Sequence, residues 1–242
     1  MAALKAAKKE LRQRIKSSLA LVSQEAVVAQ SRNAVLALQS MAEFTAARRI
    51  AVYLSMPQGE IDTKSIVHYS LSNGKYVFVP YIYKRSAQPN GEPKSVMDML
   101  ELQSIGDYDS LKRDAWGIPS LPQESVAARH NCLGGKGVSD GTIRAFEKDH
   151  GLDLIVMPGS AFDSNLGRLG HGKGFYDFFL QRYHEGGNGK LEKMPFLVGL
   201  SLNEQLLPKD QTVPRDASDW MLDALITGDG NILRREKYSI QS

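Results

Sequence analysis

The sequence predicts an α/β fold: a mostly parallel central sheet with helices on both faces, in a single Rossmann-like layered domain. Three observations lead to this prediction. The apolar runs of the chain are short, rich in β-branched or aromatic residues and not alternating, which is typical of strands buried on both faces. Segments with helical spacing lie between these runs. A chain of 242 residues can bury a full core and shows no clear linker, so we expect residues 1–242 to form one domain.

The N-terminal segment is basic and has one acidic residue, Glu10, before residue 22, so it could be an organelle transit peptide. Its apolar residues Leu11, Ile15, Leu19 and Val22 nevertheless recur at helical spacing. We therefore expect a helix that packs on the core and stays in the mature protein.

The other elements follow in order along the chain, apolar runs alternating with helical patterns. The expected strands are Arg49–Leu54, Tyr76–Pro80, Asp153–Pro158, Phe196–Leu200 and Ala224–Thr227. The expected helices are Ser23–Met41, Thr63–Ser72, Ser139–His150, with Ser139 as N-cap, and Gly174–His184. Glycine, proline and asparagine mark surface loops at Lys84–Ser95, Ala128–Ser139 and His184–Pro195.

Composition excludes several classes of protein. The net charge of +3 argues against a dedicated nucleic-acid surface and is compatible with one basic pocket for a small anion. Cys132 is the only cysteine, so we expect no disulfide, no thiolate metal site and a reducing compartment. No apolar run approaches the roughly 18 residues of a membrane span. We expect a soluble monomer without nucleic-acid or membrane partners, in the cytoplasm or alternatively in mitochondria.

One glycine-rich stretch stands out as a candidate anion site. Gly170, Gly172 and Gly174 alternate in "RLGHGKGFYD", so side chains are missing where backbone N–H groups could face a ligand. Lys173 adds a point charge among them. This combination suits a polyphosphate.

The stretch is neither a standard P-loop nor a dinucleotide fingerprint. "GRLGHGK" ends at Lys173, but Gly174 stands where a Walker A loop has serine or threonine, and the preceding strand ends far back, near Pro158. The loop still leads into a helix whose N-terminus attracts anions, and Asp177, one turn into it, could bind Mg²⁺. The alternative is a flexible surface turn followed by an acid that the first helical turn favours.

Several distinctive motifs follow one another along the chain. The longest is "MPGSAFDSNLGRLGHGKGFYDFFL", from Met157 to Leu180. The others are "KKELR" (Lys8–Arg12), "YLSMPQGEIDT" (Tyr53–Thr63), "AWGIP" (Ala115–Pro119) and "VPRDASDWMLD" (Val213–Asp223). Together these motifs resemble the 5-formyltetrahydrofolate cyclo-ligase family, also called methenyltetrahydrofolate synthetases. Phe175 departs from the family pattern, since many members have tyrosine there.

The resemblance implies roles for individual residues. It implies ATP contacts at Lys8, Arg12, Arg168, Leu169, Gly170, His171, Gly172, Lys173, Gly174, Phe175 and Tyr176. It implies folate contacts at Leu54, Met56, Glu60, Trp116, His171, Gly172, Lys173, Gly174 and Phe175. It implies Mg²⁺ ligands at Asp177 and Asp223, and we assign the catalytic roles to Lys173, Arg168 and Tyr176.

The implied reaction uses ATP to convert 5-formyltetrahydrofolate, which can carry a polyglutamate tail, into 5,10-methenyltetrahydrofolate, ADP and phosphate. A formyl oxygen is a poor leaving group, so we expect it to be phosphorylated before N10 of the folate attacks the carbon. Glu60 would hold the N–H edge of the pterin. Without the resemblance, Glu60 would be interpreted as a solvated acid and Trp116 as a core residue.

Two rival functions remain at this point. An α/β relative could use the same glycine loop for a sugar phosphate or a coenzyme A ester, but Lys8, Arg12 and the paired aspartates would then have no task. A non-catalytic folate- or nucleotide-binding protein could keep the pocket without turnover.

Overall fold

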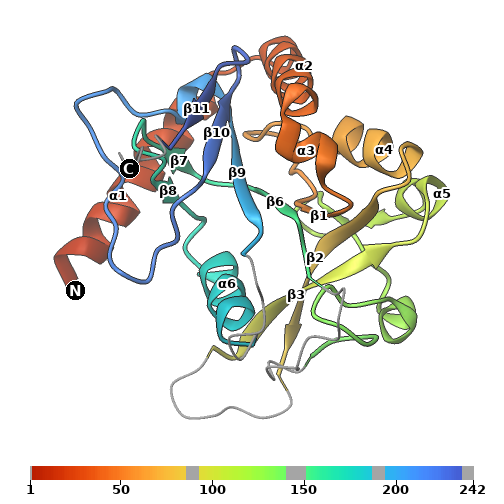
Figure 1. Cartoon of the computed structure of the whole chain (residues 1–242). Helices are drawn as coiled ribbons and strands as arrows, with labels where there is room; N and C mark the ends of the chain where they lie inside the picture. The colour runs from red at the N-terminus through yellow and green to blue at the C-terminus, as the bar shows by residue number, and fades with distance from the viewer. Residues whose placement is uncertain (1, 86–92, 140–150, 187–193, 236–242) are drawn as a thin grey trace, which may run out of the picture.

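The computed structural model describes residues 2–85, 93–139, 151–186 and 194–235, and its centre is a seven-stranded sheet (Figure 1). The strand order is β11-β10-β9-β6-β1-β2-β3. The five strands from β10 to β2 in this order are parallel, and β11 and β3 add antiparallel edges. The bounds are β1 (Arg49–Val52), β2 (Tyr76–Lys84), β3 (Ser95–Leu102), β6 (Leu154–Met157), β9 (Phe196–Ser201), β10 (Ala224–Thr227) and β11 (Ile232–Arg234).

The five parallel strands are the five that the apolar runs predict, so the fold class is confirmed. Their bounds differ by a few residues: β1 ends at Val52, whereas β2 continues to Lys84. Short hairpins outside the sheet join β4 (Lys112–Arg113) to β5 (Pro119–Ser120) and β7 (Ala161–Phe162) to β8 (Arg168–Leu169).

Helices cover both faces of the sheet, as expected (Figure 1). Ser23 caps α2 by accepting a hydrogen bond from the Ala26 amide. The helix predicted at Ser139–His150 falls, after its first residue, outside the described part of the chain. The helices are α1 (Ala2–Leu19), α2 (Gln24–Ser40), α3 (Ala42–Ala46), α4 (Lys64–Ser72), α5 (Ile105–Asp109) and α6 (Phe175–Gly186), with 3₁₀ turns η1 (Gln123–Ala128) and η2 (Asn203–Gln205).

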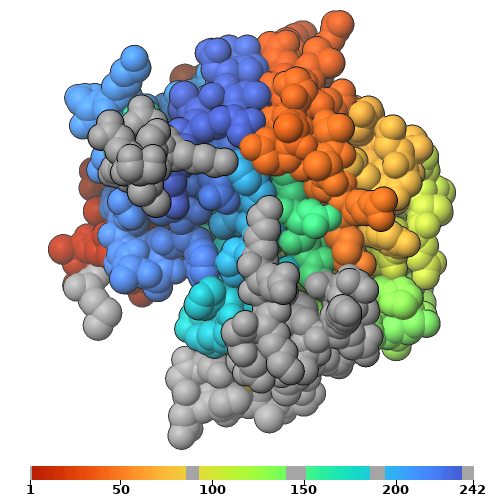
Figure 2. Space-filling view, viewed as in Figure 1, coloured from red at the N-terminus to blue at the C-terminus, as the bar shows by residue number. Residues whose placement is uncertain are grey.

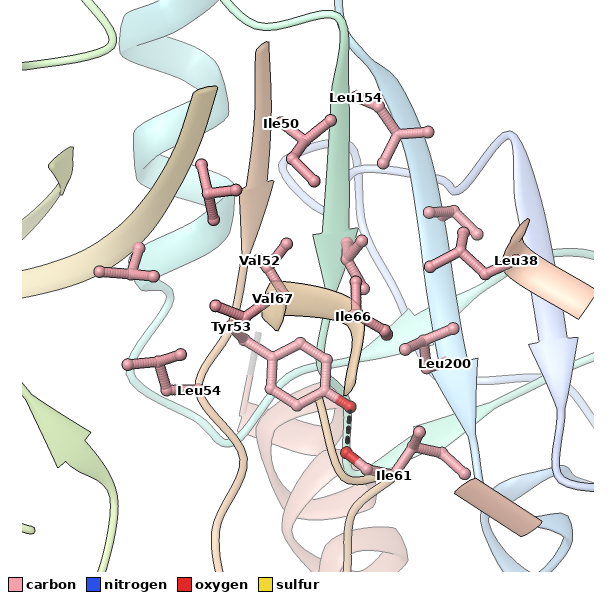
Figure 3. Packing of buried hydrophobic residues seen from close by; sticks show 14 of the residues in the cluster. Leu38, Ile50, Val52, Tyr53, Leu54, Ile61, Ile66, Val67, Leu154 and Leu200 are labelled. Atoms are coloured by element: carbon pink, nitrogen blue, oxygen red, sulfur yellow. Dashed lines mark hydrogen bonds between the residues drawn. The ribbon is translucent and has the colours of Figure 1, made fainter. Parts of the chain in front are cut away.

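The core consists of two apolar layers, one on each face of the sheet. Alternate residues of β1 divide between them: Ile50 and Val52 pack with α2 to α5, and Ala51 packs on the side of α6. At the end of β1, the buried Tyr53 hydroxyl donates a hydrogen bond to the Ile61 carbonyl at 3.0 Å (Figure 3). Burial raises the pKa of Tyr53. This bond ties the segment after β1 to the core.

The N-terminal segment is a helix packed on the core, which confirms the prediction from its spacing. Leu11 and Ile15 of α1 are buried against Ala161 and Leu169 of the β7–β8 hairpin. In the space-filling view, the red start of α1 lies at the left edge beside the blue segments near the C-terminal end of the chain (Figure 2). No helix in the described part of the chain has the length and apolar character needed to cross a membrane.

A buried ion pair holds α6 against the edge strand β3. Arg182 of α6 donates to Asp98 of β3 at 3.0 Å, and Asp98 is fully buried. Ser139 and Asn131 donate further hydrogen bonds to the same carboxylate. Cys132 is buried nearby, and burial raises the pKa of its thiol, so it offers no nucleophile. The pair fixes the position of α6, whose N-terminus follows the glycine loop.

Candidate active site

Most of the predicted site residues lie at the carboxyl edge of β1 and β6, which are neighbours in the sheet. Asp223 is an exception, because it precedes β10, which runs parallel to these strands, and therefore lies toward their amino ends. β2, the next strand along the chain, pairs with one edge of β1, whereas β6 pairs with the other edge. In open α/β sheets, ligands bind outside the carboxyl ends of strands at such a switch in direction. The segment after β1 carries Glu60, and the segment after β6 leads through the β7–β8 hairpin to the glycine loop.

The glycine loop, residues 170–174, runs from the end of β8 to the start of α6. Gly172 and Gly174 have φ of 96° and 68°, values that favour glycine. Arg12 of α1 donates from Nε to the Gly170 carbonyl at 2.8 Å. Within the described part of the chain, the amides of His171, Gly172 and Lys173 have no hydrogen-bond acceptor. The loop is therefore anchored from α1, and its N–H groups remain available to an anion.

Three basic residues predicted to contact ATP, Lys8, Arg12 and Lys173, differ in their exposure and in their partners. Lys173 is exposed and makes no hydrogen bond or ion pair with any described residue. Lys8 is 2.6 Å from the Asp219 carboxylate. Burial lowers the pKa of Arg12, whereas the charge of Asp219 opposes this shift, and an arginine stays protonated in either case. Lys173 is the cation best placed to meet a ligand directly.

Arg168 of β8 and Asp177 of α6 form a partly buried ion pair across the two ends of the loop. Arg168 donates from one terminal nitrogen to both Asp177 oxygens, at 3.0 and 3.1 Å, and from the other to the Pro158 carbonyl. The Trp220 amide also donates to Asp177. The Arg168 side chain is only 2% exposed, so this pair fixes the start of α6.

Asp223, the second carboxylate matched to Mg²⁺, lies at the start of β10. Its Oδ2 accepts a hydrogen bond from the Leu197 amide at 2.8 Å. Together with Asp219 and Trp220, it lines a pocket of about 370 Å³. No described group of three or more histidine, cysteine or acidic side chains is arranged to hold a metal. Mg²⁺ commonly uses only one or two carboxylates together with substrate phosphates, so an ion here would not need a larger set of acidic side chains.

Tyr176, in the first turn of α6, has a neutral phenol close to both Arg168 and Glu60. Its hydroxyl is buried and has no hydrogen-bond partner among the residues that the structure describes, and the Arg168 guanidinium lies 5.7 Å from the ring centre. Burial raises the pKa of Tyr176, and the charge of Glu60 adds to this, while Arg168 opposes it. The residue can therefore exchange a hydrogen bond with a ligand but cannot act as an anionic base.

Glu60 is buried, with an exposed fraction of 7%, so the interpretation as a solvated acid is wrong. Its Oε2 accepts from the Met56 amide at 3.0 Å, and its Oε1 lies 3.1 Å from Nε2 of His171 in the glycine loop. Nδ1 of His171 is 3.1 Å from the Ser160 hydroxyl. The fold thus joins the predicted folate carboxylate to the predicted ATP loop.

Trp116 is 76% exposed, so the interpretation as a core residue is wrong. Its turn packs against the segment that carries Glu60, because a Cβ at Gly117 would lie 2.6 Å from Pro57. Leu54, by contrast, is buried at the end of β1. The exposed indole stands in a turn that touches the segment carrying Glu60, so it is available to cover a bound aromatic ring.

Two residues of this site were not identified from the sequence. Asp219 pairs with Lys8, and Ser160 contacts His171. Asp219 stands in the C-terminal motif Val213–Asp223, but the sequence alone does not show that Asp219, rather than Asp216 or Asp223, pairs with Lys8. Ser160 follows β6 directly, and its position at the carboxyl end of a predicted strand is the signal that could have found it.

Comparison with known proteins gives a consistent result. Residues 4–228 match the model of the 5-formyltetrahydrofolate cyclo-ligase family. A probable 5-formyltetrahydrofolate cyclo-ligase of Caenorhabditis elegans is 32% identical over 93% of this chain and 95% of its own length. The 5-formyltetrahydrofolate cyclo-ligase of Saccharomyces cerevisiae is 30% identical over 94% of this chain and 98% of its own. The solved structure of Aquifex aeolicus 5,10-methenyltetrahydrofolate synthetase is 25% identical, with a TM-score of 0.62 over 97% of this chain and 96% of its own.

Proposed function

The chain belongs to the 5-formyltetrahydrofolate cyclo-ligase family, and on that premise we propose that it uses ATP to close 5-formyltetrahydrofolate into 5,10-methenyltetrahydrofolate. The observation that carries the proposal is the contact between the glycine loop and the buried Glu60, through His171. A polyphosphate on the loop and a pterin on Glu60 would lie side by side there. The products would be ADP and phosphate.

The residues around the loop suit phosphoryl transfer to the formyl oxygen. Lys173 and the loop amides are positioned to neutralise charge that spreads over the transferred group. We assign Arg168 to holding Asp177 and the helix start, and the Tyr176 hydroxyl to a hydrogen bond with a ligand. N10 of the folate then attacks the activated carbon and phosphate departs, an intramolecular step that needs alignment rather than an enzyme nucleophile.

Asp177 and Asp223 are the residues that would hold Mg²⁺. The ion would supply charge neutralisation to the phosphate oxygens when bound. The chain's own contribution is to position the carboxylates: Arg168 and the Trp220 amide orient Asp177, and the Leu197 amide orients Asp223.

Replacing either carboxylate with its amide, Asp177→Asn or Asp223→Asn, should raise the Mg²⁺ concentration at half-maximal activity. An amide is a weaker ligand for a hard cation, and we expect a shift of about tenfold. Activity is measured across a MgCl₂ titration at saturating ATP, with thermal unfolding to verify folding. Asp109→Asn, in the exposed pair with His68, is the matched control. An unchanged Mg²⁺ requirement in both site variants would show that the metal is held elsewhere.

Replacing Arg12 with alanine should raise the KM for ATP about tenfold while the KM for folate changes little. The variant removes a charged hydrogen bond that anchors the loop at Gly170. Removing all of residues 1–12 would be a poorer test, because Leu11 is part of the core. Lys9→Ala, on the exposed side of the same helix, is the control. Equal effects on both substrates would argue against the ATP assignment.

A direct assay tests the function. Purified protein is incubated with 5-formyltetrahydrofolate and MgATP, and the methenyl product is followed by its absorbance. We expect product with both substrates and none when either is omitted. Binding of both ligands without product would instead favour the non-catalytic binding protein. We extend the proposal to a monomer that accepts polyglutamated folate in the cytoplasm, with mitochondria as the alternative location.

A further inference from the structure

A short relay of hydrogen bonds links three segments at the carboxyl edge of the sheet. The Ser160 hydroxyl lies 3.1 Å from Nδ1 of His171, and Nε2 of His171 lies 3.1 Å from Oε1 of Glu60. Ser160 follows β6, His171 stands inside the glycine loop, and Glu60 follows β1. Since an ionised carboxylate only accepts, Nε2 donates to Glu60. When the imidazole is neutral, Nδ1 then accepts from the Ser160 hydroxyl.

We propose that His171 is a positioning residue that couples ATP binding to folate binding, with Ser160 fixing its imidazole. The proposal rests on the proposed pterin contact of Glu60. In it, ATP on the glycine loop orders His171, His171 orients the Glu60 carboxylate, and the oriented carboxylate binds the pterin more tightly.

The hydrogen-bond capacity of Glu60 is compatible with this role. A carboxylate has about four acceptor positions on its two oxygens. The Met56 amide uses one on Oε2, and His171 uses one on Oε1. Each oxygen keeps one position, which matches the paired N–H donors at the edge of a pterin. His171 and Met56 therefore fix the carboxylate without competing with the folate.

The position of His171 in the loop provides the coupling. Its neighbours are Gly170, whose carbonyl Arg12 holds, and Gly172, which adopts a positive φ. An anion that binds the unpaired amides of the loop restricts the same backbone that carries the imidazole. The His171 side chain is 45% exposed and Glu60 only 7%, so the ligand-free histidine is the less restrained partner. The entropy cost of ordering His171 is then met only once. ATP binding should therefore tighten folate binding, and folate binding should tighten ATP binding by the same factor.

The experiment measures the Kd of 5-formyltetrahydrofolate by calorimetry, with and without saturating Mg²⁺ and the non-hydrolysable β,γ-imido analogue of ATP. The variants are His171→Phe, which keeps a ring but no nitrogens, Ser160→Ala, and Ser160→Thr, which keeps the hydroxyl. His68→Phe is the matched control, because it removes a second histidine–carboxylate contact, to Asp109, between α4 and α5. Thermal unfolding verifies that each variant is folded.

We expect the analogue to tighten folate binding about fivefold or more in the wild type and in His68→Phe, within the usual range of coupling between two sites. In His171→Phe the ratio of the two folate Kd values should fall to about one. In Ser160→Ala the analogue should tighten folate binding less than in the wild type, and in Ser160→Thr it should tighten it as much. A wild-type ratio in His171→Phe, or no coupling in the wild type, would overturn the proposal.

Two further variants separate this proposal from the pterin assignment. Glu60→Gln should weaken folate binding, and adding His171→Phe to it should cause no further loss, because His171 acts through Glu60. Additive losses would mean that His171 contacts the folate directly, and the positioning role would be wrong. Wild-type folate affinity in Glu60→Gln would contradict the pterin contact itself, and the coupling proposal with it.

Discussion

Replacing Lys173 with alanine is expected to lower kcat by about 100-fold or more while the protein remains folded. Lys173 is exposed and makes no hydrogen bond or ion pair with the described residues, so the fold does not depend on its charge. Its charge lies among the amides of His171, Gly172 and Lys173, which have no hydrogen-bond acceptor among the described residues. Removing one charge-stabilising group from a transition state costs about 3 kcal/mol, which corresponds to this loss of rate.

Single-turnover and steady-state rates, with circular dichroism for the fold, measure this effect. Lys173→Arg keeps the charge and should retain more activity than Lys173→Ala. Lys209→Ala, an exposed lysine in the turn after Pro208, should be indistinguishable from the wild type. Near-normal turnover in a folded Lys173→Ala variant would mean that the phosphates bind elsewhere.

Replacing Asp98 with alanine should lower the free energy of unfolding by about 3–5 kcal/mol, because it leaves Arg182 as an uncompensated buried charge. Asp98 is fully buried and Arg182 is 4% exposed. The same change removes the acceptor for the Ser139 and Asn131 side chains. Urea unfolding monitored by circular dichroism measures the loss. The start of α6 should become less well positioned, so activity should fall in parallel with stability.

An exposed ion pair provides the control for this variant. Arg234→Ala breaks a pair with Glu43 whose side chains are 44% and 32% exposed, and it should cost less than about 1 kcal/mol. Arg182→Met combined with Asp98→Leu removes both charges and should recover part of the stability lost in Asp98→Ala. Equal losses from the buried and exposed pairs would contradict the structural role assigned to Asp98.

The parallel strands could be predicted from the sequence because burial on both faces leaves an unbroken apolar run. The edge strand β3 could not, since Asp98 and Glu101 interrupt its apolar residues. Asp98 is tolerated only because Arg182, 84 residues away, reaches it from α6. A contact of that sequence separation leaves no local pattern. The N-terminal helix α1, by contrast, was visible from its spacing, because Leu11 and Ile15 lie on one face.

The parts of the site that could be predicted are those whose residues lie close together in the sequence. The glycines around Lys173 have a local pattern, and Glu60 and His171 were each assigned through family motifs. Their mutual contact was not, because it spans 111 residues and depends on β1 and β6 lying side by side. Ser160 was missed for the same reason. A lone serine acquires its role only from the side chain that the fold places beside it.

The central claim is that the protein activates the formyl oxygen by transferring a phosphoryl group to it, and an isotope experiment tests this most directly. The substrate carries ¹⁸O in its formyl group, and inorganic phosphate is analysed by mass spectrometry after complete turnover. Because ring closure breaks the carbon–oxygen bond, the oxygen should depart attached to phosphorus. We expect one labelled atom in each phosphate formed. Label in water with unlabelled phosphate would mean that ATP hydrolysis only drives a conformational change, and would contradict direct activation.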